Sequence, residues 1–83
     1  MRPISYTRQA LKALRKMPAD MAERIIAKIE QYAEEPDSLS NNVKALKGRE
    51  GIRLRVGDWR VIMSDEGVVL AVLEIGPRGS VYE

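Results

Sequence analysis

The sequence predicts a single α+β domain over residues 1–83, with an N-terminal helical hairpin packed on one face of an antiparallel sheet. In the first half, two stretches repeat apolar residues at spacings of three and four, the period of a helix with one buried side. In the second half, three apolar-rich stretches are separated by turn residues that include glycine, as in hairpin-connected strands. With a short apolar segment before the helices, the predicted order is β-α-α-β-β-β.

The first half begins with a short predicted strand at Ile4–Tyr6. Thr7 is a suitable N-cap for a helix from Arg8 to about Met17. Pro18 stops that helix and can stand near the start of the next, which runs from about Ala19 to Glu34. Because the link is short, we expect an antiparallel helical hairpin whose apolar stripes face the core.

A polar connector follows from Asp37 to Gly51, and we expect Val43 and Leu46 to turn inward from it. A turn at Asp65–Gly67 later leads into a nearly continuous apolar strand, Val68–Ile75, which Gly76-Pro77 should end. A strand of this kind is typically covered on both faces or central in its sheet.

Between these segments lies the stretch IRLRVGDWRVIM, residues 52–63, which predicts a hairpin with Gly57-Asp58 at its turn. Pairing outward from the turn places Arg55 opposite Arg60 and Arg53 opposite Ile62. Paired residues share a face, so one face is entirely apolar and consists of Ile52, Leu54, Val56, Trp59, Val61 and Met63. The other face carries three arginines and no carboxylate from these two strands.

Two interpretations of the arginine-rich face remain open. Like charges directly opposite on a sheet are destabilising, so the arginines could be solvated and balanced by acids elsewhere in the fold. Alternatively, they form a preformed anion site, because guanidinium groups stay charged and bind phosphate in a bidentate manner. The second interpretation suits a nucleic-acid backbone.

The composition narrows the possible chemistry. The chain has no cysteine and no histidine, which excludes disulfides, cysteine-based zinc sites and histidine acid–base catalysis. No run of 18 apolar residues is present, and the N-terminus does not open a signal peptide, so we expect a cytoplasmic protein without a membrane segment. Any catalysis must use arginine, lysine, tyrosine, serine or carboxylates.

Charge is unevenly distributed although the net charge is only +2. Residues 1–16 hold five basic groups and no acid, whereas residues 20–37 hold six acids and two bases. Residues 44–60 are again basic, and residues 65–83 are acidic. This alternation indicates a localised basic surface.

The element order, the connector NVKALKG, the hairpin IRLRVGDWRVIM and the tail IGPRGSVYE together resemble the RelE/ParE superfamily of bacterial type II toxins, most closely its RelE-like branch. The resemblance covers nearly the whole chain and is strongest from Val43 to Tyr82. It implies a ribosome-dependent endonuclease that enters the ribosomal A site and cuts mRNA without a metal or small-molecule cofactor. It also implies a cognate antitoxin that masks the basic face.

The resemblance also implies roles for individual residues. Arg60 and Arg78 would stabilise the charge that develops on the phosphate, with Arg55 beside them, and Tyr82 would stack on a base or donate a proton. The expected RNA-binding residues are Arg53, Arg55, Lys44, Lys47 and Arg49.

The sequence departs from the RelE-like pattern at the strand positions of Arg53 and Arg55, where relatives often have lysine. Arginine does not readily lose a proton, so the general base stays open, with Lys44 and Lys47 as candidates. Two alternatives to the nuclease therefore stand: a ParE-like inhibitor of DNA gyrase without nuclease activity, and a catalytically inactive relative.

Overall fold

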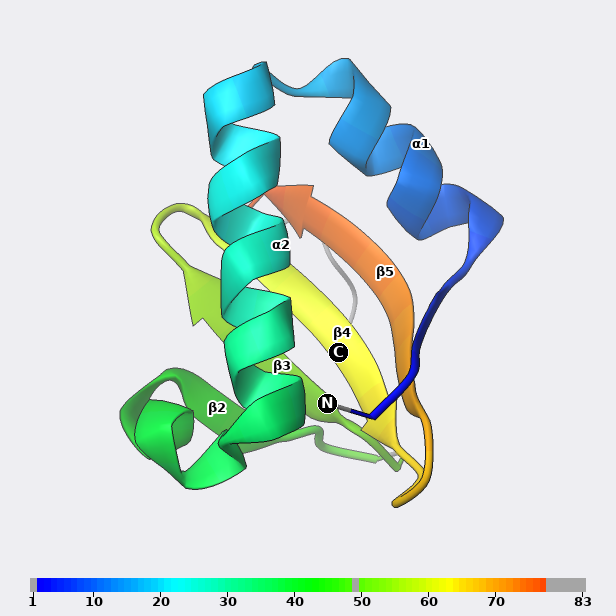
Figure 1. Cartoon of the computed structure of the whole chain (residues 1–83), viewed down its shortest axis with the longest axis vertical. Helices are drawn as coiled ribbons and strands as arrows, with labels where there is room; N and C mark the ends of the chain where they lie inside the picture. Colours follow the sequence, from blue (N-terminus) through cyan, green and yellow to red (C-terminus); the bar gives the residue numbers. More distant parts are fainter. Residues whose placement is uncertain (1, 49, 78–83) are drawn as a thin grey trace.

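The computed structural model describes residues 2–48 and 50–77 and confirms the α+β class, with helices on one side of an open sheet (Figure 1). Neighbouring strands are antiparallel, except that the first strand pairs in parallel with the last. Across the sheet the strands are β1 (Ile4–Tyr6), β5 (Leu70–Pro77), β4 (Trp59–Asp65), β3 (Ile52–Val56) and β2 (Val43–Ala45).

The two predicted helices are present as α1 (Arg8–Lys16) and α2 (Ala19–Glu34). The Thr7 side chain accepts a hydrogen bond from the Ala10 backbone N–H at 3.2 Å, which confirms the predicted N-cap. In Figure 1, α1 lies along β5 and α2 crosses the sheet over β3 and β4, so both helices cover the same face. Within the described part of the chain, no helix is both long and apolar enough to cross a lipid bilayer.

The connector contains structure that the sequence analysis did not anticipate. It forms a 3₁₀ helix, η1 (Pro36–Asn42), followed by the edge strand β2, which pairs with β3 so that Lys44 lies opposite Arg53. The predicted element order omitted β2, because three residues are too few to display an alternating pattern and the strand depends on pairing with β3. Leu46 is buried, as expected.

The last strand begins and ends two residues later than predicted. Asp65 pairs with Leu70, which leaves residues 66–69 as the loop, and Val68 is 76% exposed there. Pro77 is accommodated because it is the final residue of the strand, opposite Trp59. A register shift opposite Ile62 and Met63 inserts Leu73 as an extra residue on β5, so Val72 and Ile75 are both buried in the core.

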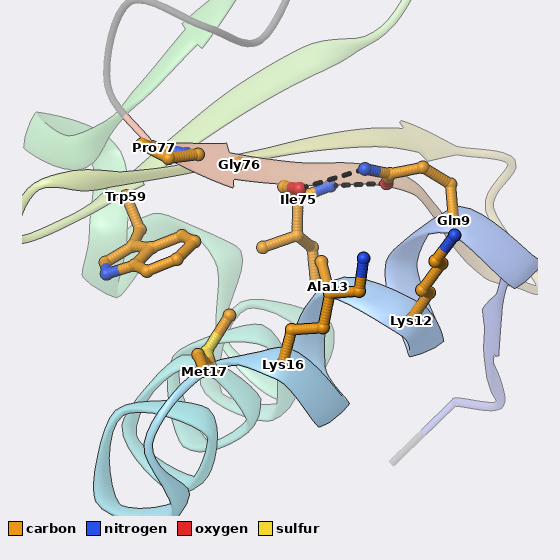
Figure 2. A pocket seen from close by; sticks show the side chains of 9 residues that line it. All are labelled: Gln9, Lys12, Ala13, Lys16, Met17, Trp59, Ile75, Gly76 and Pro77. Carbon is orange, nitrogen blue, oxygen red and sulfur yellow. Dashed lines mark hydrogen bonds between the residues drawn. The ribbon is translucent and has the colours of Figure 1, made fainter.

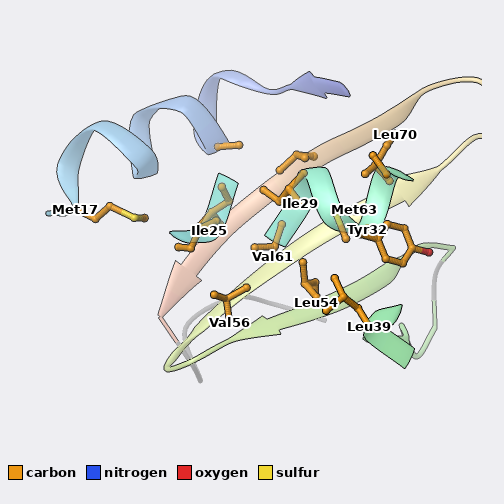
Figure 3. Close-up of a cluster of buried hydrophobic side chains, with 14 residues drawn as sticks. Met17, Ile25, Ile29, Tyr32, Leu39, Leu54, Val56, Val61, Met63 and Leu70 are labelled. Carbon is orange, nitrogen blue, oxygen red and sulfur yellow. The ribbon is translucent and has the colours of Figure 1, made fainter. Parts of the chain in front are cut away.

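The apolar face of the hairpin forms the floor of the core, as predicted (Figure 3). Leu54, Val56, Val61 and Met63 are buried against α2, and Ile52 and Trp59 lie at the margin, partly buried. The helix contributes Ile25, Ile29 and Tyr32 to the same cluster. Since this face is filled by core packing, the three arginines of the hairpin project from the opposite face of the sheet.

Candidate nucleic-acid interface

The turn of the β3–β4 hairpin fixes the positions of the arginines. Gly57 has a φ of 58°, the value needed at the first central position of the two-residue turn that glycine favours. The pairing outward from it matches the prediction, with Arg55 opposite Arg60 and Arg53 opposite Ile62. We call Arg53, Arg55 and Arg60 the arginine face.

A polar hollow of about 260 Å³ lies against the arginine face. We call it the arginine hollow; its lining comes from the end of η1 and from β2, β3 and β4, and consists of Asn41, Asn42, Lys44, Arg53, Arg55 and Arg60. None of these six lining residues carries a carboxylate. Lysine and arginine are donors without acceptor atoms, and the asparagine amides add further donors, so the lining suits a ligand rich in acceptor oxygens.

The side of the sheet that carries the arginine face also carries a fully buried apolar residue. Ile62 lies between Arg53 and Glu74 in the strand register and is completely buried, although it faces away from the main core. Arg53 and Arg60 are themselves partly buried, whereas Arg55 is exposed and its Nε donates a hydrogen bond to the Gly57 carbonyl at 3.4 Å. Partial burial on a sheet limits the conformations of the guanidinium groups and favours a preorganised site.

Among the strand residues that the structure describes, Glu74 is the one acid that the register brings to this face. It lies opposite Ile62 on β5 and is a diagonal neighbour of Arg60, whose direct partner is Gly76. Counting Lys44 and the three arginines against Glu74, the described residues on this face include four cations and one carboxylate, a net charge of +3. Cations therefore outnumber acids among the described strand residues of this face, which favours the anion-site interpretation.

The structure brings together only part of the predicted set of site residues. Lys44 lines the hollow with the arginine face, whereas Lys47 is exposed and lies outside the lining. Arg49, Arg78 and Tyr82 lie outside the described residues.

Three residues at this face were not anticipated. Asn41 and Asn42 reach the hollow through η1, whose position depends on long-range packing, so no local pattern in the sequence marks them. Glu74 had a usable signal, since it is the one charged residue in an otherwise apolar strand.

The principal ion pair among the described residues lies at the other end of the sheet. Arg2 pairs with Asp65 through two hydrogen bonds, and this contact holds the pKa of the Asp65 carboxyl below its usual value. Burial raises the pKa of the neighbouring Tyr32 hydroxyl. No cluster of three or more metal-ligating side chains occurs among residues 2–48 and 50–77.

Solved structures similar to this chain include toxins and toxin–antitoxin complexes. The chain is 27% identical to a protein in the archaeal RelE–RelB complex from Pyrococcus horikoshii, with a TM-score of 0.77 over 96% of this chain and 98% of that one. It is also 27% identical to a protein in the intact Escherichia coli RelBE toxin–antitoxin complex, with a TM-score of 0.69 over 93% and 96%. A YoeB/ParE toxin from Agrobacterium tumefaciens shares the fold at a TM-score of 0.73 and 20% identity, covering 92% and 98%.

The family of the chain follows from its sequence. Residues 4–82 match the family described as "ParE toxin of type II toxin-antitoxin system, parDE", and the chain belongs to this family, within the RelE/ParE superfamily. No curated protein matches the chain.

Proposed function

We propose that this toxin is a ribosome-dependent mRNA endonuclease whose arginine hollow holds the RNA backbone at the cleavage site. The observation that carries the proposal is the hollow itself, where four cations and two amides surround a space and no described lining residue carries a carboxylate. The 27% identity to RelE proteins supports the same branch of the superfamily.

The chemistry follows from what these side chains can supply. The ribose 2′-oxygen attacks the adjacent phosphorus, the bond to the 5′-oxygen breaks, and the products are a cyclic phosphate and a 5′-hydroxyl. Negative charge grows on the non-bridging oxygens as the attack proceeds, and fixed guanidinium donors stabilise that charge. We assign this role to Arg60 and Arg55, with Arg53 positioning the backbone.

A proton must leave the 2′-hydroxyl during the attack. Lys44 is the one lysine in the lining of the hollow, and its amine can accept a proton once it is deprotonated, whereas arginine stays charged. We therefore place proton acceptance at Lys44 in preference to Lys47. Arg78 and Tyr82 keep their proposed roles in charge stabilisation and in base stacking or proton donation, and Arg49 and Lys47 keep theirs in RNA binding.

We further propose that a cognate antitoxin neutralises the chain, as the RelE–RelB and RelBE complexes of its structural neighbours suggest. An acidic segment laid across the arginine face would relieve the repulsion among Arg53, Arg55 and Arg60 and would block RNA at the same time.

Inhibition of DNA gyrase without cleavage is the second candidate function. It is favoured by one observation, namely that the matching family is described as the ParE toxin. A gyrase inhibitor would leave mRNA intact and would instead impair supercoiling or cause double-strand DNA breaks.

The test is an in vitro translation reaction containing the purified chain, followed by primer extension on the mRNA. We expect cuts within codons at the ribosomal A site that disappear when ribosomes are omitted. Intact mRNA during active translation, together with inhibition in a gyrase supercoiling assay, would replace the nuclease proposal with the second candidate.

A further inference from the structure

A second basic surface lies on α1, on the helical side of the sheet. Its four cations, Arg8, Lys12, Arg15 and Lys16, are all exposed and line one shallow hollow of about 480 Å³. Because successive members are four, three and one residues apart, they fall on one side of the helix and extend over ~12 Å of its axis. We call these four residues the α1 ridge.

The α1 ridge lacks the acidic partners that usually accompany surface cations. Residues 1–16 contain no Asp or Glu, and none of the four side chains forms an ion pair or hydrogen bond with any residue that the structure describes. Arg8 is moreover the first residue of the helix, where the helix dipole disfavours positive charge. By contrast, on α2, Asp20 precedes Arg24 by four residues, a favourable spacing for opposite charges.

The ridge is separate from the arginine face. The α1 helix packs on the core side of β5, and the arginine face projects from the opposite side of the sheet. Lys12 and Lys16 also border an apolar hollow that contains Trp59 (Figure 2). One short RNA segment held in the arginine hollow would therefore leave the α1 ridge unoccupied.

We infer that the α1 ridge binds the phosphate backbone of double-helical RNA. Four cations along a rigid helix match a regular row of phosphates, and they supply no base-specific hydrogen-bonding pattern. The four ridge positions include no aromatic ring, whereas surfaces that bind single strands combine cations with stacking rings. The choice of RNA over DNA rests on the proposed function, but the backbone contact does not depend on cleavage.

The test uses the full chain and a fluorescently labelled RNA hairpin of about 16 base pairs, with affinity measured by anisotropy between about 50 and 200 mM salt. The test variant is Lys12→Gln/Lys16→Gln, and its control is Arg24→Gln/Lys28→Gln on α2, which removes the same net charge. Glutamine is a good helix former, and thermal melting followed by circular dichroism checks that both variants are folded.

We expect the Lys12→Gln/Lys16→Gln variant to bind the hairpin roughly 10-fold more weakly and to lose about one to two units of the salt-dependence slope. The control variant should retain the slope of the unmodified chain. Equal losses in both variants would overturn the inference, because net charge alone would then explain binding, and so would failure of the unmodified chain to bind the hairpin.

Two further probes identify the partner. Tighter binding to a DNA duplex of the same length would overturn the assignment to RNA. Ridge-dependent binding of a polyglutamate peptide without binding of the RNA hairpin would overturn it in favour of an acidic protein. Because the measurement contains no ribosome and no cleavage step, its failure is distinguishable from failure of the nuclease proposal.

Discussion

Asp65 joins three parts of the chain that are far apart in the sequence. Its carboxylate pairs with Arg2 and accepts hydrogen bonds from the Gly67 backbone N–H at 3.0 Å and from the Tyr32 hydroxyl at 3.5 Å. Arg2 in turn donates to the Ala33 carbonyl at 3.1 Å and lies 6.0 Å from the centre of the Tyr32 ring. These contacts fasten the segment before β1 to the end of α2 and to the β4–β5 loop.

We predict that Asp65→Asn lowers the free energy of unfolding by about 1 kcal/mol, since the side chains of Arg2 and Asp65 are 18% and 33% exposed and solvent screens the pair. For a domain of this size, that change lowers the melting temperature by about 4–8 °C. Glu66→Gln is the matched control, because it removes a neighbouring carboxylate whose side chain forms no ion pair with the described residues.

The effect of Asp65→Asn should depend on pH. The pKa of Asp65 is lowered in the folded state, so its contribution is fully present above the unfolded value of about 3.9 and is lost as the pH falls through the folded pKa. The difference in stability between the unmodified chain and Asp65→Asn should therefore shrink in acid. A constant difference down to about pH 2 would show that the ion pair is not its source.

At the scale of elements, the edge of β5 is completed by the start of α1. The three residues of β1 pair with β5 only from Leu70 to Val72, and Thr7 then donates from its backbone N–H to the Val72 carbonyl at 3.0 Å. Beyond Val72, where β1 no longer pairs with β5, the Gln9 side chain forms hydrogen bonds with the β5 backbone instead. It donates to the Ile75 carbonyl at 3.1 Å and accepts from the Ile75 N–H at 3.0 Å (Figure 2).

We predict that Gln9→Ala destabilises the fold by about 1–3 kcal/mol, because it leaves both backbone groups of the buried Ile75 without these partners. Denaturant unfolding measures the effect. Lys12→Ala on the exposed side of the same helix is the control and should change stability by less than about 0.5 kcal/mol. Equal stability of Gln9→Ala and the control would contradict this role of the glutamine.

The elements that sequence analysis predicted well are those that local patterns determine. The alternation of apolar and polar residues around Gly57-Asp58 was sufficient to predict the full register of the β3–β4 hairpin. Thr7 marks the start of α1, and Pro18 separates α1 from α2. The strand β2 and the two-residue displacement of β5 could not be predicted in this way. The strand β2 depends on its pairing with β3. The displaced limits of β5 depend on the pairing of Asp65 with Leu70 and on the extra β5 residue opposite Ile62 and Met63.

At the scale of the whole molecule, the fold separates two basic surfaces with a core between them. The arginine face was predictable, because one hairpin supplies all three arginines and its register follows from its turn. The complete hollow was not, because Asn41 and Asn42 reach it through tertiary contacts of η1, and the expected residue Lys44 reaches it only through the pairing of β2 with β3. The acid on the same face, Glu74, likewise depends on which strand pairs with β4.

The central claim is that the arginine face acts on RNA, and the most direct measurement compares Arg60→Ala with Arg24→Ala in the translation and primer-extension reaction. Arg24 is an exposed arginine on α2, outside the arginine hollow, so both variants lose the same charge. We predict that Arg60→Ala cuts mRNA at least about 100-fold more slowly than the unmodified chain, while Arg24→Ala cuts at the unmodified rate. Matched thermal melting of the two variants would show that folding is not the cause. Cleavage by a folded Arg60→Ala variant at the unmodified rate would contradict the claim.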